Sequence, residues 1–329
     1  MARLRIATFN LESLDEETGE RAPLAERIAV LRPQLRRLEA DLLCLQEVNT
    51  RPAAVHEPPR LAALAQLLAD TDYERYFRAF SSVSGHGGPS GRHNLVLLSR
   101  FPISATGQVQ HELVPPLSYR PVTAKPPVKE ALLLSWDRPI LSARIELPGG
   151  QRLSVLNLHL KAPLPVAIPG QKISAAAWRT VGGWAEGFFL AAMKRAGQAL
   201  EARLLVERLF DAEPAALIAV CGDFNAESRE TPVRVLIGDE SEGMGGAGSA
   251  RTLVALEESV AEARRYSVLH MRRPLMLDHM LVSPALAAWR HRFEVHNEEL
   301  RDEALDPLTE HATPGSYHAP LVAEFALPG

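Results

Sequence analysis

Cysteine is nearly absent from this 329-residue chain, which has two thiols, Cys44 and Cys221. Each lies in or at the end of an apolar run that is typical of a strand, so we expect two buried thiols and neither a disulfide nor a metal-binding pair. The chain also lacks an apolar run near the roughly 20 residues of a membrane span, and Met1 to Arg5 lead into a predicted strand without a signal peptide. We therefore expect a cytoplasmic protein with no membrane span, and the sequence indicates no obligate protein partner.

A positive net charge is also missing. The formal net charge is −4, which excludes a protein-wide attraction to nucleic acid. The charge is unevenly distributed, however: residues 115–195 hold eleven Lys and Arg against four Asp and Glu, a net charge of +7, which leaves −11 for the remainder. This basic middle could steer an anionic substrate, or it could be an imbalance that arose by chance.

Hydrophobic residues are plentiful, at 46% of the chain, which is enough for a sizeable core. At roughly 100–200 residues per domain, the length allows one or two domains. Apolar residues recur at spacings of four and three between Pro23 and Glu39, which predicts a helix. A strand over residues 3–9, followed by a polar loop from Glu12, is expected before this helix, and a strand that ends at Glu47 after it.

The middle of the chain combines a predicted hairpin, a proline-rich loop and a long helix. Two alternating apolar runs, 140–147 and 152–158, are joined by Pro-Gly-Gly and predict the hairpin. Five prolines within residues 111–130 predict a surface loop that carries Arg120, Lys125 and Lys129. The helix is predicted from about Glu186 to Phe210. We expect its charged residues, Glu201 included, on the solvated side, and its buried side to hold Phe189, Met193, Ala196, Leu200 and Leu204.

Two apolar features of this region have alternative interpretations. The aromatic residues Trp178, Trp184, Phe188 and Phe189 are either part of the core or an exposed patch that binds an acyl chain or a base. The proline-stiffened residues 162–170 could line a substrate cleft or rest on the core.

Polar side chains follow several predicted strands at the point where each strand ends. Asp223 and Asn225 come directly after the apolar run 215–221 and, being two residues apart, point the same way on an extended chain. An Asx-type turn that closes the strand would explain this pair equally well. Residues of the same kind end three other strands or lie within two late segments, 277–283 and 316–320: Asn10, Glu47, His159, Asp278 and His318.

The chemistry of these residues favours a metal-assisted reaction. Glu47 is a hard oxygen ligand of the kind that suits Mg²⁺ or Mn²⁺. His159 and His318 titrate near neutral pH and can give or take a proton. Cleavage of a phosphoester needs a cation near the phosphoryl oxygens, an oriented water and help for the leaving oxygen.

Taken in order, the motifs TFN, LQEV, NLHL, GDFN, LDHMLVS and SxHxP resemble those of the endonuclease/exonuclease/phosphatase superfamily, which includes deoxyribonuclease I. The resemblance spans almost the whole chain. It implies one domain over residues 1–329 with an α/β fold, a four-layered α/β/β/α sandwich of two mixed β-sheets. It also implies an enzyme that hydrolyses phosphate esters with a divalent metal.

The resemblance also implies roles for individual residues. Glu47 would be the main metal ligand, with Asn10 beside the metal. His159 and His318 would lie against the phosphate, and Asp278 would fix the tautomer of His318. The pair of residues that would hold the attacking water and a phosphoryl oxygen is Asp223 and Asn225. The general base, either Asp223 or the His318–Asp278 pair, is left open.

Three further positions are predicted to contact substrate. Arg92 and Asn94 precede a strand that runs into Ser99-Arg100-Phe101-Pro102-Ile103, which is similar to a turn of the superfamily, and they are candidate contacts to a phosphate or leaving group. Tyr317 stands where the superfamily usually has Asp, directly before the last His. This departure predicts weaker metal binding with chemistry retained, and it makes Tyr317 a candidate hydrogen-bond partner of a phosphate oxygen.

Among phosphoesterase activities, that of a nuclease is the first interpretation, and the basic middle of the chain supports it. A phosphatase or phosphodiesterase on a small-molecule or lipid-headgroup phosphate is the second, supported by the overall acidity and by residues 162–170. A catalytically silent binding scaffold is the alternative of another class.

Overall fold

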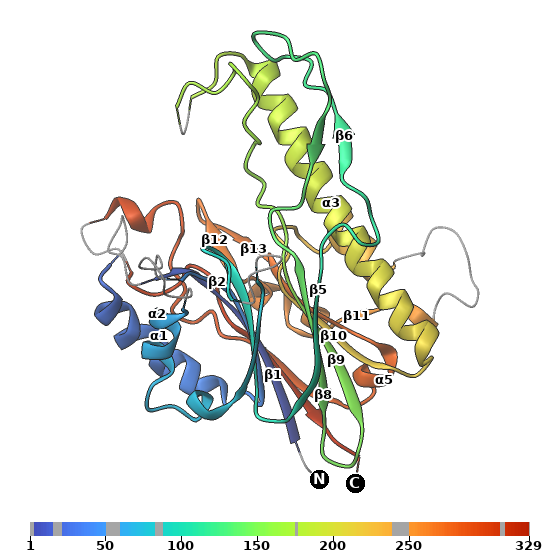
Figure 1. The fold of residues 1–329 in the computed structure, drawn as a ribbon. Coiled ribbons are helices and arrows are strands. Elements are labelled where there is room, and N and C mark those ends of the chain that lie inside the picture. The colour runs from blue at the N-terminus through green and yellow to red at the C-terminus, as the bar shows by residue number, and fades with distance from the viewer. Residues whose placement is uncertain are drawn as a thin grey trace.

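The computed structural model describes residues 3–15, 22–50, 60–82, 88–174, 177–238, 250–309 and 313–328. Its centre is a pair of six-stranded sheets packed face to face (Figure 1). The first sheet has the order β15-β16-β1-β2-β4-β3, in which β1 and β2 are parallel and the other pairs antiparallel. Its strands are β1 (Arg3–Leu14), β2 (Leu42–Val48), β3 (Phe77–Phe80), β4 (Asn94–Ser99), β15 (Arg290–Val295) and β16 (Leu321–Ala326).

The second sheet has the order β11-β14-β10-β9-β8-β5, in which β9 and β10 are parallel. The hairpin predicted from Pro-Gly-Gly is confirmed, since β8 pairs antiparallel with β9. The strands of this sheet are β5 (Ile103–Val109), β8 (Ile140–Glu146), β9 (Arg152–His159), β10 (Leu217–Asp223), β11 (Val254–Ala255) and β14 (Asp278–Val282).

Helices cover the outer face of each sheet. On the first sheet, the buried side of α1 (Leu24–Leu38) and of α2 (Ala62–Leu68) forms one apolar cluster with the strands. On the second, α3 (Val181–Ala212) and α4 (Thr231–Ile237) form another. The predicted four-layered α/β/β/α sandwich of two mixed sheets is therefore confirmed. No helix in the described ranges combines the length and the apolar character needed to cross a membrane.

Smaller elements lie at the margins. In the described ranges they are α5 (Pro284–Ala287), the two-stranded pairs β6 (Leu117–Tyr119) with β7 (Leu132–Leu134) and β12 (Val268–His270) with β13 (Arg273–Leu275), and the 3₁₀ turns η1 (Asp72–Arg75), η3 (Leu256–Ser259), η4 (Glu262–Arg264) and η5 (Asp306–Leu308).

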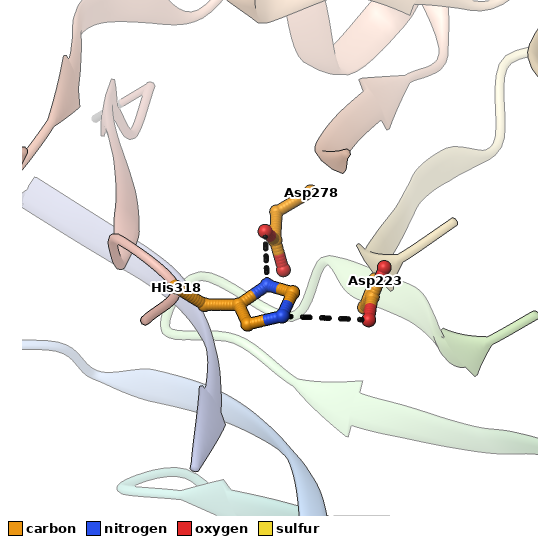
Figure 2. Close-up of side chains that lie close together, drawn as sticks. All are labelled: Asp223, Asp278 and His318. Atoms are coloured by element: carbon orange, nitrogen blue, oxygen red, sulfur yellow. Dashed lines mark hydrogen bonds and ion pairs between the residues drawn. The ribbon is translucent and has the colours of Figure 1, made fainter. Parts of the chain in front are cut away.

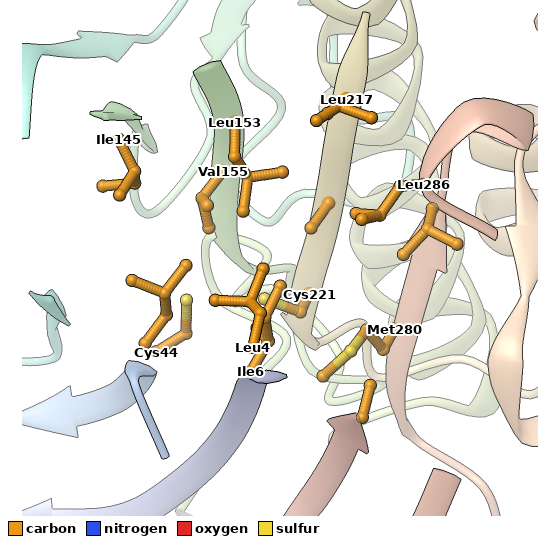
Figure 3. Packing of buried hydrophobic residues seen from close by; sticks show 14 of the residues in the cluster. Leu4, Ile6, Cys44, Ile145, Leu153, Val155, Leu217, Cys221, Met280 and Leu286 are labelled. Atoms are coloured by element: carbon orange, nitrogen blue, oxygen red, sulfur yellow. The ribbon is translucent and has the colours of Figure 1, made fainter. Parts of the chain in front are cut away.

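The core between the sheets is a layer of aliphatic side chains from both sheets (Figure 3). Cys44 and Cys221 lie in this layer as fully buried free thiols, as predicted. The neighbouring Cys221 thiol and burial raise the pKa of the Cys44 thiol well above its usual range. Both cysteines therefore act as small apolar side chains in the core.

Polar side chains near the ends of β2 and β9 join the two sheets. The amide of Gln46 on β2 donates to Oδ1 of Asn157 on β9 at 2.7 Å. The Asn157 amide in turn donates to the carbonyl oxygens of Leu45 and Val96 at 3.1 and 3.0 Å. Because these groups are fully buried, the bonds fix the position of one sheet against the other.

Helix α3 differs from its prediction in both length and orientation. It begins at Val181, where the Thr180 hydroxyl caps the helix by accepting from the N–H of Gly183 at 3.0 Å. Phe189, Leu200 and Leu204, which were expected on the buried side, are exposed. Glu201, expected on the solvated side, is completely buried. That part of the prediction is wrong because the buried side of α3 meets loop backbone that needs an acceptor, rather than a purely apolar surface.

Glu201 supplies that acceptor. Its carboxylate accepts from the backbone N–H groups of His111 and Leu113 at 3.1 Å, from that of Val114 at 3.4 Å, and from the Trp136 indole at 2.7 Å. The replacement Glu201→Ala leaves these donors without a partner, so we expect the free energy of unfolding to fall by about 3 kcal/mol. Urea denaturation measures this, with Glu213→Ala, at an exposed position just after α3, as a control that changes stability by less than about 0.5 kcal/mol. Equal effects of the two substitutions would contradict the role of Glu201.

The loops that Glu201 anchors belong to an extension that we call the arm, defined as residues 111–138 together with 161–195. It comprises the β6–β7 pair, the loops around it and the first half of α3, and Figure 1 shows it projecting beyond the ends of the sheets, on the side away from both termini. The proline-rich residues 111–130 lie here, partly as the expected surface loop and partly as β6.

Candidate active site

Four strands end at the same edge of the sandwich. Asn10 and Glu47 lie on the parallel strands β1 and β2, where Asn10 is in register with Gln46. His159 and Asp223 end the parallel strands β9 and β10 and are in register with each other. Because parallel strands end on the same side of a sheet and the two sheets face each other, these four residues converge.

Their side chains form a closed set of contacts. The Asn10 amide nitrogen lies 3.0 Å from Asp223 Oδ2 and 3.5 Å from Glu47 Oε1. His159 Nε2 lies 3.4 Å from the same Asp223 oxygen and 3.6 Å from the same Glu47 oxygen. Asn10 and His159 therefore each contact both carboxylates, that of Glu47 in the first sheet and that of Asp223 in the second.

His318 completes this group from the loop before β16. Its Nδ1 lies 2.8 Å from Asp278 Oδ2, and its Nε2 lies 4.0 Å from Asp223 Oδ2 (Figure 2). Asp278 starts β14 and is in register with Asp223 on β10, so the sheet itself sets the spacing of the two carboxylates. Glu47, His159, Asp223 and His318 therefore meet in one place, and His318 has the carboxylate partner that was predicted for it.

Burial and mutual charge shift the pKa values of these groups. Burial raises the pKa of Asp223 to about 7, against the charge of His318 and with the support of the Asp278 carboxylate. Burial would lower the pKa of His318, but Asp278 holds that pKa well above its usual range. For His159, burial and the charge of Arg138 lower the pKa well below the usual range. The two histidines therefore differ in character, since His318 favours the charged form and His159 the neutral form.

Glu47 is held in an unusual backbone conformation. Its φ is +58°, and the pairing of β2 with β4 shifts register between Leu45 and Val48, which marks a bulge at this residue. Burial alone would raise the pKa of its carboxyl, but His93, His159 and Arg138 together hold that pKa well below its usual range. Glu47 is thus an ionised carboxylate, turned into the site by the bulge.

Left-handed backbone recurs around this site. Positive φ values between 48° and 58° occur at Glu12, Ser13, Glu47, His93 and Asn225. Such conformations cost free energy in residues other than glycine and persist where the surroundings impose them, often at functional sites. Glu12 and Ser13 were predicted to lie in a loop, but β1 continues through both with a register shift between Asn10 and Leu14.

Asn225 takes part both in the Asx-type turn and in the presentation of Asp223 to the site, the two arrangements that the sequence allowed. Its backbone N–H donates to Asp223 Oδ1 at 2.8 Å, which is the Asx-type turn. Its side-chain amide donates to Asp223 Oδ2 and to the Leu160 carbonyl, both at 3.1 Å. The turn therefore presents Asp223 to the site and ties it to the chain that follows His159.

Two of the three candidate substrate contacts are held by bonds to other residues. Asn94 is buried, and its amide donates at 2.8 Å to the carbonyl oxygens of Val48 and Ser90, so it anchors the loop before β4. The Tyr317 hydroxyl is also buried and donates to Asp306 Oδ2 at 3.0 Å. Arg92 is exposed on the loop before β4. For Asn94 and Tyr317 a phosphate contact would require these bonds to break, and for all three it stays a prediction.

Several residues at the site were missed by the sequence analysis. His93 Nδ1 lies 3.5 Å from Glu47 Oε2, and the Ser13 hydroxyl donates to the same oxygen at 3.1 Å. Arg138 has a charge that acts on both Glu47 and Asp223, and its buried Nε has no hydrogen-bond partner among the described residues. Loop positions without a strand-end pattern gave no signal for His93 or Arg138.

Glu12 bears on the unusual Tyr317. Its carboxylate accepts from the backbone N–H of Tyr317 at 2.7 Å, and its charge helps to raise the pKa of His318. An acid from β1 therefore lies next to the position where the superfamily usually has Asp.

The donor groups present fit a divalent cation. Asp278 Oδ1 is buried without a hydrogen-bond partner in the described part of the chain. One ligand atom from each of Asp223, Asp278 and His318 lies within 4.8 Å of the others, which makes these three a possible metal site. Glu47 and Asp223 offer a second set, with carboxylate oxygens bridged by Asn10. Oxygen donors of this kind are those that Mg²⁺ and Mn²⁺ prefer.

The sequence pattern of the Endonuclease/Exonuclease/phosphatase family matches residues 7–318. Several solved structures have the same fold. One is D. rerio TDP2 in complex with a single-strand DNA product, with a TM-score of 0.56 and 16% sequence identity over 99% of this chain and 100% of that chain. Another is an AP endonuclease from Archaeoglobus fulgidus, with a TM-score of 0.53 and 17% identity over 98% of this chain and 100% of that chain. A third is an endonuclease/exonuclease/phosphatase from Bacteroides vulgatus, with a TM-score of 0.58 and 13% identity over 100% of both chains. No curated protein matches the chain significantly.

Proposed function

Because the chain belongs to the endonuclease/exonuclease/phosphatase family, we propose that it is a hydrolase that cleaves phosphodiesters with Mg²⁺ or Mn²⁺. The observation that carries the proposal is the meeting of an ionised Glu47, a buried Asp223 and the His318–Asp278 pair at one edge of the sandwich. These groups match the needs of phosphoryl transfer, in which positioning and charge stabilisation do most of the work.

The residues divide this work by their surroundings. Glu47 and Asp223 would hold the cation, because the raised pKa of His318 favours the charged ring, which has no lone pair free for a metal. When bound, the cation would neutralise charge on the phosphoryl oxygens and favour deprotonation of water. Asp278 orients the His318 ring and keeps its Nε2 directed toward Asp223. A water in reach of both residues could give its proton to Asp223, whose pKa burial raises to about 7, or to His318 once that ring is neutral.

Arg138 and His159 complete the site on the side of the second sheet. Arg138 lies before β8 and His159 at the end of β9, and these strands are neighbours in that sheet. A guanidinium that acts on Glu47 and Asp223 also suits a phosphoryl oxygen, since phosphate is a common partner of arginine. Neutral His159 can donate one hydrogen bond to the same group without adding charge.

Hydrolysis of bis-p-nitrophenyl phosphate tests the reaction class. We expect turnover with Mg²⁺ or Mn²⁺, loss to the uncatalysed rate in excess chelator, and recovery when metal is restored, because the buried carboxylates repel an anionic substrate unless a cation screens them. Full activity in excess chelator would contradict the metal dependence. Failure to cleave any member of a phosphate-ester panel with either metal would favour the silent binding scaffold.

The substrate of the proposed reaction has two candidates. Nucleic acid is supported by the net charge of +7 over residues 115–195 and by the DNA product bound to D. rerio TDP2. A lipid-headgroup phosphate is supported by the exposed apolar side chains of the arm, and we favour it for that reason. Plasmid DNA and phospholipid vesicles, compared at equal phosphate concentration, discriminate between the two.

A further inference from the structure

The arm exposes apolar side chains to an unusual degree. Nine of the large apolar residues that are exposed in the described ranges belong to it, including Val122, Leu133, Ile173, Val181, Trp184 and Phe188. They come from both parts of the arm: three lie in residues 111–138, and six lie between Leu164, five residues beyond His159, and Phe189 on α3. Isolated exposed apolar residues are ordinary, but a concentration of this kind on one projection marks an interaction surface.

This exposure is built into an ordered part of the fold. Glu186 on α3 accepts from the backbone N–H groups of Val122 and Thr123 at 2.6 and 2.9 Å and from the hydroxyls of Thr123 and Tyr119 at 2.5 and 2.9 Å. At Gly187, an added Cβ would lie 2.4 Å from the Val166 carbonyl oxygen, so the loop packs directly against the helix backbone. One side of α3 is thus fixed against the loops.

The other side of α3 faces solvent with apolar residues. Val181, Trp184 and Phe188 follow helical spacing, and the last two rings are stacked with centroids 5.4 Å apart. An ordinary surface helix has polar residues on this side. Its apolar character gains stability only when something apolar covers it.

Cations accompany the exposed apolar residues. The arm has nine Lys and Arg against four Asp and Glu, a net charge of +5, while the rest of the chain has a net charge of −9. Five of the nine cations are exposed, namely Arg120, Lys125, Lys129, Lys172 and Arg179, whereas Arg195 is buried. Among the four acids, Glu186 is occupied by the loop hydrogen bonds. Bulky apolar and aromatic side chains interspersed with Lys and Arg are the composition that binds an anionic lipid surface, because the chains enter the interface while the cations meet the headgroups.

We propose that the arm docks on an anionic lipid bilayer. Single-stranded nucleic acid fits less well, because bases stack on aromatic rings and gain little from exposed aliphatic residues such as Val122, Leu133 and Ile173. A symmetric contact between the arms of two copies would bring together two surfaces with a charge of +5. Docking goes beyond the proposed hydrolysis and is measured without turnover, so either can fail alone. Since Arg138 and Lys161 lie at the base of the arm, a docked arm would also bring the site near the lipid phosphates.

Vesicle flotation in excess chelator tests the docking. We expect the protein to bind vesicles of phosphatidylcholine mixed with phosphatidylglycerol, to bind pure phosphatidylcholine more weakly, and to lose affinity as salt is raised. Tryptophan fluorescence should shift to the blue on binding, and the shift should be smaller in Trp184→Phe, which leaves the partly buried Trp178 in the arm. Absence of binding to the mixed vesicles at low salt would overturn the proposal, and so would a shift that persists undiminished in Trp184→Phe.

A matched pair of substitutions separates the arm from the rest of the surface. Val181 and Leu308 are equally exposed, at 82%, and Leu308 lies in η5, outside the arm. We expect Val181→Asp to weaken vesicle binding about tenfold or more, while Leu308→Asp leaves it unchanged. Val181 is the first residue of α3, where a negative charge suits the helix dipole, so folding should be preserved and is checked by circular dichroism.

The remaining outcomes overturn the proposal. Equal losses in the two variants would show that the arm is not the contact. If sedimentation finds a dimer that Val181→Asp dissociates, a second copy covers the arm. If Val181→Asp weakens binding of a single-stranded oligonucleotide and leaves vesicle binding intact, the arm binds nucleic acid.

Discussion

Replacement of Glu47 by Gln should reduce kcat/KM for a phosphodiester by roughly 10³-fold, the scale on which loss of one preorganised charged group acts at a reaction centre. The substitution keeps size and shape but removes the carboxylate that β2 directs toward Asn10 and His159. Because its neighbours hold the pKa of Glu47 well below the usual range, the native side chain is ionised at any pH where the enzyme would work. The residual rate should also respond less to added Mg²⁺, since a main cation ligand has been lost.

A matched substitution at another buried acid isolates this effect. Glu324 on β16 is buried and bound to Arg5 at 2.9 Å, near the start of β1, whereas Asn10 lies further along the same strand at the site. Glu324→Gln makes the same chemical change and should lower the unfolding free energy while leaving kcat/KM for the folded protein within about twofold. Retention of more than a tenth of the wild-type rate in Glu47→Gln would remove Glu47 from the reaction.

The meeting of these groups could be predicted from the sequence because it follows from strand ends. Asn10, Glu47, His159 and Asp223 each follow an apolar run, and parallel strands bring such positions to one edge of a sheet. The four-layered fold followed from the same ordered motifs. The motifs did not reveal how the Glu47 side chain is oriented. The bulge that turns Glu47 into the site depends on the pairing of β2 with β4, which no local pattern reveals.

The interpretation failed where polar groups are buried by tertiary contacts. Glu201 is of a residue type that is typical of a solvated helix face. Its carboxylate nevertheless accepts from three backbone N–H groups of a distant loop and from the Trp136 indole. With Glu201 inward, Phe189, Leu200 and Leu204 turn outward, so one error in the phase of α3 changed the whole face. His93 and Arg138 escaped notice for a related reason, since each reaches the site from a loop whose path is set by the sandwich.

The second large effect is expected at the His318–Asp278 pair. We expect His318→Ala to lower kcat by roughly 10³-fold and Asp278→Asn by roughly 10²-fold, because one removes the proton-transferring ring and the other reverses the hydrogen bond that fixes its tautomer. If the two act as a unit, the double variant should be no slower than His318→Ala alone. Losses that multiply would mean that Asp278 acts separately from His318, for instance on the cation through its unpartnered Oδ1.

A second histidine–carboxylate pair gives the control for this cycle. His296 and Glu294 lie 3.3 Å apart on and just after β15, and among the described residues neither side chain bonds to a residue of the site. His296→Ala and Glu294→Gln should each leave kcat within about twofold, which would exclude a general effect of losing such a pair. Because Asp223 also faces His318, it could accept the proton from water in the absence of the ring. A residual rate in His318→Ala that a further Asp223→Asn abolishes even at saturating Mg²⁺ would assign the proton transfer to Asp223, whereas an unchanged residual rate would leave it with His318 and Asp278.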